Sequence, residues 1–159
     1  MLDIHQVTIR KMVAHDATPI AQAFAHMHKN QEQYERYWQE NVVGERVTLI
    51  AELEGSIVGY TNIVWKSGYV SFCQQGIPEI NDMNVIAPLR CNGIGTKMIE
   101  CAEQIVRLSG KSVIGIGVGM TPGYEIAQRL YPKLGYVEDG SGFHNDEWGG
   151  GIYLTKSLG

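Results

Sequence analysis

The chain has 159 residues, of which 44% are hydrophobic and 19% charged, and its net charge is −4. This composition excludes a disordered chain and fits one domain with its own core. The acidic balance lacks the basic surface that binding to nucleic acids or anionic membranes requires. Three cysteines without metal-type spacing favour free thiols in a cytoplasmic protein, and the scattered histidines suggest no metal site. We therefore expect a single cytoplasmic domain, residues 1–159, that binds no metal, nucleic acid or membrane.

The first half of the chain predicts a strand, two helices and a hairpin. Thr18 and Pro19 favour a helix start, because Thr caps helices well and Pro fits the first helical position. The segment Glu54-Gly55-Ser56 separates two β-rich runs and is typical of a hairpin. In chain order, the expected elements are a strand at 7–13, a helix from Thr18, a helix at 31–41, and strands at 47–53 and 57–65.

The second half alternates strands with helices. The expected elements are a strand at 77–85, a helix from about Ile94 to Ser109-Gly110, a strand at 113–118, a helix from Thr121-Pro122, and a last strand at 151–158. The strand, helix and strand across 77–118 make one parallel crossover, with antiparallel strands around it. The expected class is α/β or α+β, with a mixed, mostly antiparallel sheet and helices on both faces.

A glycine-containing segment joins the strand at 77–85 to the following helix. It reads Arg90-Cys91-Asn92-Gly93-Ile94-Gly95-Thr96. Glycines let a backbone approach a ligand closely, and a helix N-terminus offers free N–H donors and partial positive charge, so the combination suits a phosphate. The segment is not a Walker loop and lacks the third glycine of the dinucleotide fingerprint. A plain strand-to-helix turn is the alternative.

Three segments in the second half of the chain carry recognisable motifs. They are the strand Glu79–Val85, the loop Arg90-x-x-Gly93-x-Gly95, and the stretch Leu130-Tyr131-Pro132-Lys133-Leu134-Gly135-Tyr136. They resemble, in that order, the fourth strand, the pyrophosphate loop and the second signature of the GNAT N-acetyltransferase superfamily. The resemblance implies a sheet of six to seven strands that is splayed between a parallel fourth and fifth strand. It also implies acetyl-CoA as co-substrate, and dimers are common in such folds.

The resemblance assigns donor-binding and catalytic residues by position. Tyr131 matches a tyrosine that commonly faces the CoA sulfur and would protonate the departing thiolate. The alternative for Tyr131 is a tyrosine that only packs in the core. Glu79 matches a fourth-strand glutamate that serves some relatives as general base, whereas others use water. The alternative for Glu79 is an exposed charge near a strand start. Asp82 is a weaker candidate, because alternation along the strand places it on the other face from Glu79. The residues expected to contact acetyl-CoA are Met83, Asn84, Val85, Arg90, Cys91, Asn92, Gly93, Ile94, Gly95, Thr96, Tyr124 and Tyr131.

Two positions depart from the family pattern. Tyr124 stands where many relatives carry asparagine, seven residues before Tyr131, so on a helix the two tyrosines would share a face. Pro132 disfavours helical geometry at Tyr131 and could displace its phenol.

The strand at 113–118 carries a row of glycines. Gly115, Gly117 and Gly119 fall on one face, which predicts close approach by either a tightly packed helix or the cofactor.

The acceptor is specified only as an amine of a small molecule or peptide. Four acidic residues near the C-terminus suit a cationic amine or form a solvated loop: Glu138, Asp139, Asp146 and Glu147. Phe143 and Trp148 could add an aromatic wall to such a site. The leading hypothesis is acetyl transfer from acetyl-CoA to a primary amine by direct attack. The alternatives are a CoA-binding sensor without turnover and a nucleotide-binding module.

Overall fold

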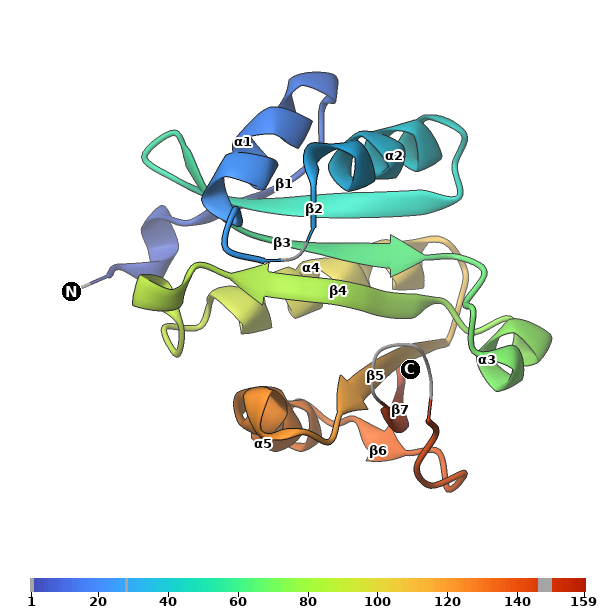
Figure 1. Cartoon of the computed structure of the whole chain (residues 1–159). Helices are drawn as coiled ribbons and strands as arrows, with labels where there is room; N and C mark the ends of the chain where they lie inside the picture. Colours follow the sequence, from blue (N-terminus) through green and yellow to red (C-terminus); the bar gives the residue numbers. More distant parts are fainter. Residues whose placement is uncertain (1, 28, 146–149) are drawn as a thin grey trace. The chain divides into compact units, whose positions relative to one another are not determined.

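The computed structural model describes residues 2–27, 29–145 and 150–159. Its strands are β1 (Thr8–Lys11), β2 (Arg46–Leu53), β3 (Ser56–Val64), β4 (Glu79–Val85), β5 (Val113–Gly119), β6 (Val137–Glu138) and β7 (Gly151–Ser157) (Figure 1). Its α-helices are α1 (Ala17–Ala23), α2 (Gln31–Val42), α3 (Val70–Gln75), α4 (Ile94–Leu108) and α5 (Glu125–Lys133). The strand order is β1-β2-β3-β4-β5-β7-β6, and the β4–β5 pair is parallel. The predicted class, a mixed and mostly antiparallel α/β sheet, is confirmed.

The chain divides into two compact units. The first unit is Met1–Val64 with Asp82–Ala102, and the second is Trp65–Asn81 with Glu103–Gly159. Strand β4 and helix α4 each begin in one unit and end in the other. Within the described ranges, no helix is long and apolar enough to cross a membrane.

The first unit is built on the β2–β3 hairpin. Its register runs from Arg46 opposite Val64 to Leu53 opposite Ser56. Glu54 and Gly55 make the turn with φ of 51° and 80°. Two consecutive positive φ values match the twist of a two-residue hairpin turn, so the predicted hairpin is confirmed.

Helices cover both faces of the sheet in the first unit. Ile50 packs into a buried cluster with residues of α1 and α2, including Ile20 and Tyr34. The next residue, Ala51, packs into another cluster with Met98 of α4. Successive strand residues point to opposite faces, so β2 contributes side chains to a hydrophobic cluster on each face of the sheet.

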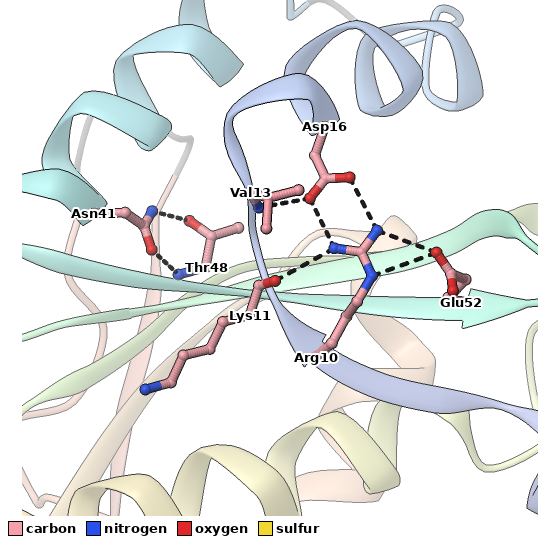
Figure 2. Close-up of polar contacts among 7 residues, drawn as sticks. All are labelled: Arg10, Lys11, Val13, Asp16, Asn41, Thr48 and Glu52. Carbon is pink, nitrogen blue, oxygen red and sulfur yellow. Dashed lines mark hydrogen bonds and ion pairs between the residues drawn. The ribbon is translucent and has the colours of Figure 1, made fainter.

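Hydrogen bonds between polar side chains, of which Asp16 is buried, fix the N-terminal segment to this sheet (Figure 2). Arg10 of β1 donates to both carboxylate oxygens of Asp16 at 2.8 and 2.9 Å, and to Glu52 of β2 at 3.1 Å. Asp16 also accepts the Val13 N–H at 2.7 Å. A 3₁₀ turn, Ala14–Asp16, runs directly into α1, so this helix begins at Ala17 and not at a Thr18 cap as predicted.

The second unit contains the β5–β7 ladder, which runs from Val113 opposite Ser157 to Gly119 opposite Gly151. The start of β4 pairs in parallel with β5, with Glu79 opposite Gly115. The carboxylate of buried Glu103 accepts the Tyr136 hydroxyl at 2.9 Å and the Lys156 ammonium at 3.0 Å. This ion pair ties the end of α4 to β7 within the unit.

Aromatic rings of the chain itself fill the space beside the β5 glycines. A Cβ built on Gly115 would lie 2.3 Å from the Phe72 ring, and one on Gly119 would lie 2.5 Å from the Tyr124 ring. At Gly117, the Tyr153 ring of β7 lies 3.1 Å from the same built position. The predicted close approach is confirmed, and at Gly115 the approaching element is a helix, α3. At the other two positions the approaching ring belongs to a strand and to a 3₁₀ turn, and not to a helix.

Candidate active site

The loop after β4 has the backbone shape of an anion cradle. Cys91 and Gly93 adopt positive φ, 63° and 92°. The first backbone bond of α4 runs from the Lys97 N–H to the Gly93 carbonyl at 3.0 Å. The N–H groups of the residues between them, Ile94 to Thr96, therefore have no carbonyl one turn earlier to bond. Free donors and the helix dipole at this point favour an anion.

Side chains of the loop hold this shape. The Nε of Arg90 donates to the Val85 carbonyl at 3.1 Å, which ties the loop to the end of β4. Asn92 donates to the carbonyls of Leu89 and Arg90 at 3.1 and 3.0 Å. Lys97 donates to the Ile4 and Val7 carbonyls, so its ammonium braces the N-terminal segment. Arg90 is exposed and supplies the formal positive charge of the loop itself.

The second half of β4 lies beside this loop in the first unit. The Met83 side chain packs against the start of α4, and a Cβ built on Gly95 would lie 3.6 Å from its methyl carbon. Asn84 donates to the Tyr60 hydroxyl and to Asp82, both at 3.0 Å. The residues predicted to bind the donor on Met83–Val85 and on the loop are thus brought together in one unit.

A polar cluster that sequence analysis missed surrounds Asp82. We define the Asp82 cluster as Lys29, Tyr37, Tyr60, Asp82 and Asn84. The Asp82 carboxylate accepts the Tyr37 hydroxyl at 2.7 Å and the Tyr60 hydroxyl at 3.0 Å, and it forms an ion pair with Lys29. Burial, and then the Asp82 charge, raise the pKa of both tyrosines, so both stay protonated as donors.

Asp82 itself has an unusual backbone. Its φ is 55°, in the left-handed region, although it lies within strand β4. The simple alternation that the sequence analysis assumed between Glu79 and Asp82 therefore does not continue through this residue. Nothing in the sequence marks such a position, because Asp tolerates left-handed geometry but does not demand it.

Glu79 lies in the second unit and is buried, with 8% of its surface exposed. Its carboxylate accepts the hydroxyl of Ser67, whose oxygen in turn accepts the Tyr69 N–H at 2.9 Å. The alternative interpretation as an exposed charge at a strand start is wrong. A buried, hydrogen-bonded carboxylate is compatible with a base that acts directly or through a water.

Tyr131 is buried in α5 and keeps helical geometry, since the helix continues through Pro132 to Lys133. Burial, together with the nearby phenol of Tyr124, raises the pKa of Tyr131. Tyr124 ends the 3₁₀ turn directly before α5, so the two tyrosines are not two turns apart on one helix, although their phenols interact electrostatically. The turn arises because Pro122 fixes φ at its start.

Part of the predicted acidic region falls outside the described residues, namely Asp146, Glu147 and Trp148. Glu138 and Phe143 are exposed. Asp139 accepts hydrogen bonds from Tyr69 at 2.7 Å and Ser141 at 2.6 Å. Burial acts to raise the pKa of Asp139, but the bonds from Ser141 and Tyr69 outweigh it and lower the pKa overall. In the part of the chain that the structure describes, no three His, Cys, Asp or Glu side chains are grouped to hold a metal.

Comparisons with known proteins place this fold among solved structures of acetyltransferases. A search among curated sequences finds no match. An N-acetyltransferase from Staphylococcus aureus Mu50 has a TM-score of 0.77 at 15% identity, covering 96% of this chain and 99% of that chain. The PaiA N-acetyltransferase from Thermoplasma acidophilum, in complex with coenzyme A, has a TM-score of 0.71 at 12% identity, covering 95% and 98%. A spermidine N-acetyltransferase chimera from Vibrio cholerae and hSSAT has a TM-score of 0.71 at 16% identity, covering 96% of each chain.

These structural likenesses show a shared fold. The family itself is shown by sequence, because the model of the acetyltransferase (GNAT) family matches residues 12–136. That range includes β4, the loop at 90–96 and Tyr131 of α5. The chain belongs to the GNAT acetyltransferase family.

Proposed function

We propose that residues 1–159 act as one acyltransferase domain that moves an acetyl group from acetyl-CoA to a primary amine by direct attack. The observation that carries the proposal is the loop at 90–96, with left-handed Cys91 and Gly93, free helix N–H groups and an exposed Arg90. These are the groups that a pyrophosphate needs. Complexes of related folds with coenzyme A support the same donor.

The donor is held in this proposal by backbone rather than by side chains. Ile94 to Thr96 and the residues before them donate to the pyrophosphate, while Met83 and Val85 of β4 offer backbone groups to the pantetheine. The side chains of Met83 and Asn84 have other partners, which keeps the strand in place. Tyr124, whose ring covers Gly119, is proposed to contact the donor as well.

The acceptor must lose a proton before or during attack. A lysine-type amine has a pKa of about 10.4, so roughly one molecule in a few thousand is neutral at pH 7. We assign proton removal to Glu79 directly or through a water. The amine nitrogen then attacks the thioester carbonyl carbon, the Met83 N–H stabilises the oxyanion, and the C–S bond breaks.

Tyr131 is assigned to the departing thiolate. Its raised pKa means that it stays protonated at neutral pH and can donate a hydrogen bond. The same shift makes it a weaker acid than a CoA-like thiol, whose pKa is about 8.5. Tyr131 therefore stabilises the thiolate by hydrogen bonding more than by complete proton transfer.

Calorimetry with acetyl-CoA, followed by turnover across an amine panel, tests the proposal. The parent should bind acetyl-CoA and release CoA only when an amine is present. Gly93→Val should abolish binding, because a β-branched residue cannot adopt a φ of 92° without strain, so the backbone of the loop must change shape. Binding without turnover on any amine would favour the CoA sensor. Unchanged affinity in a folded Gly93→Val variant would remove the loop from the site.

The role of Glu79 has a separate test. Glu79→Gln should reduce turnover most at low pH and leave the affinity for acetyl-CoA unchanged. A pH–rate profile that overlays the parent profile would assign proton removal to water alone.

A further inference from the structure

The Asp82 carboxylate is already well satisfied without a cation. Tyr37 donates at 2.7 Å, Tyr60 at 3.0 Å and Asn84 at 3.0 Å. These donors stand on helix α2 and on strands β3 and β4, which are regular and packed elements. The three neutral donors hold the carboxylate in one orientation.

The cation of the Asp82 cluster does not come from a helix or a strand. Lys29 lies outside regular structure, directly before Asn30, the N-cap residue of α2. Its ammonium contacts Asp82, lies 3.4 Å from the Tyr60 hydroxyl, and lies 6.0 Å from the centre of the Tyr60 ring. Its side chain is 16% exposed and that of Asp82 is 13% exposed, so both reach the protein surface. Lysine joins to its charge through a flexible four-carbon stem.

Backbone strain marks the same place. A left-handed conformation is uncommon for a non-glycine residue, and residues that keep it cluster at functional sites. Asp82 keeps it within a strand, immediately before Met83. The strain turns the carboxylate toward the tyrosines and Lys29, beside the strand segment proposed to hold the acyl donor.

We propose that Asp82, Tyr37, Tyr60 and Asn84 form a binding site for an ammonium group of the acceptor, and that Lys29 occupies this site until the acceptor displaces it. This inference rests on the proposed acyltransferase function. An ammonium bound to an ionised carboxylate keeps its proton, and a protonated amine has no lone pair for attack. The group at Asp82 is therefore a recognition group, and the reacting amine is a second one. The acceptor class is a diamine or polyamine.

Matched acceptors test this assignment. In the parent, 1,4-diaminobutane should be acetylated efficiently, whereas butylamine, of the same length with one amine, should be a poor acceptor. Lys29→Met should lower the KM for the diamine by about tenfold or more, because a competitor that fills a site about nine-tenths of the time weakens apparent affinity by that factor. Lys11→Met, which removes an exposed charge of the same unit, is the control and should leave this KM unchanged. Asp82→Asn should remove the preference for the diamine over butylamine.

A titration of the parent protein requires no variant to fold. Adding 1,4-diaminobutane to ¹⁵N-labelled protein should shift the Asn84 side-chain amide and the Lys29 ammonium signals in a saturable way. Absence of both shifts, or a diamine KM that Lys29→Met fails to lower, would overturn the inference. If the parent binds no acetyl-CoA and acetylates no amine, the proposed function fails. The titration would still report on the ammonium site in that case, so the two failures are distinguishable.

Discussion

Asp16 is a buried residue that also forms an ion pair. Only 1% of its surface is exposed, yet it carries an ion pair with Arg10 (Figure 2). Burial acts to raise the pKa of Asp16, but the hydrogen bonds from Arg10 and the Val13 N–H outweigh it, so the pKa falls below its ordinary value. A depressed pKa in the folded state stabilises the fold above the unfolded pKa, about 4 for Asp. That stability is lost as the pH falls through the folded value.

Replacing Asp16 by Asn tests this linkage. The amide keeps the shape but not the charge, and Arg10, which is about one-third exposed, is left partly solvated. We expect the free energy of unfolding at pH 7 to fall by about 2–3 kcal/mol. The difference from the parent should shrink as the pH falls below about 4, because the parent then loses the same contribution. Urea unfolding at pH 7 and at a series of pH values below about 4 measures it. Glu52→Gln, at the more exposed partner of Arg10, should cost less than about 1 kcal/mol at pH 7.

Tyr131→Phe tests the thiolate assignment. The ring and its packing remain, so turnover should fall by about 10²-fold with little change in acetyl-CoA affinity. Because the pKa of Tyr131 is raised, its phenol should stay protonated at high pH. The parent should therefore show no loss of kcat from phenol ionisation up to about pH 10. The defect should shrink with an acyl donor whose thiol is more acidic. A silent substitution in an active enzyme would mean that the thiolate leaves unaided.

At the scale of elements, the two glycines around the start of α4 have different structural roles. Gly93 has φ 92° and precedes the helix, whereas Gly95 is the second residue of α4. A methyl group on Gly95 would reach only ordinary contact with Met83, at 3.6 Å. The same methyl group therefore strains one position and suits the other.

Alanine at each position should shift stability in opposite directions. Gly93→Ala should lower the free energy of unfolding by about 1–2 kcal/mol through left-handed strain. Gly95→Ala should raise it by up to about 1 kcal/mol, because alanine is the better helix former. Thermal unfolding of the two variants beside the parent measures the contrast. A stabilising Gly93→Ala would contradict the left-handed geometry of the loop.

Elements with long periodic patterns were predictable, and short or context-driven ones were not. The hairpin and α4 follow from turn residues and an apolar stripe. Helix α3 has six residues and β6 has two, which is too short for a period to register. The loop at 90–96 could be found from its glycines. The Asp82 cluster could not, because its members are distant in sequence and meet only through the register of β3 and β4 and the packing of α2.

At the scale of the whole molecule, donor binding should appear as stability. A ligand that binds only the folded state stabilises it by about 2.7 kcal/mol at one hundred times its Kd. For a chain of 159 residues, that corresponds to a rise in Tm of roughly 5–10 °C. Acetyl-CoA should produce this rise in the parent and none in Gly93→Val. An equal rise with ATP would instead support a nucleotide-binding module.

The rings that fill the spaces beside the β5 glycines constrain how this sequence can change. An added methyl group on Gly115 collides with Phe72, and one on Gly119 collides with Tyr124. Substitutions at each glycine and at its neighbouring aromatic residue are therefore coupled. A larger residue at the glycine position is tolerated only if the aromatic residue is replaced by a smaller one. Such pairs have strongly non-additive effects, since the double exchange restores the volume that either single exchange disturbs. Among homologues of this chain, we expect positions 72 and 115 to covary, and likewise positions 119 and 124.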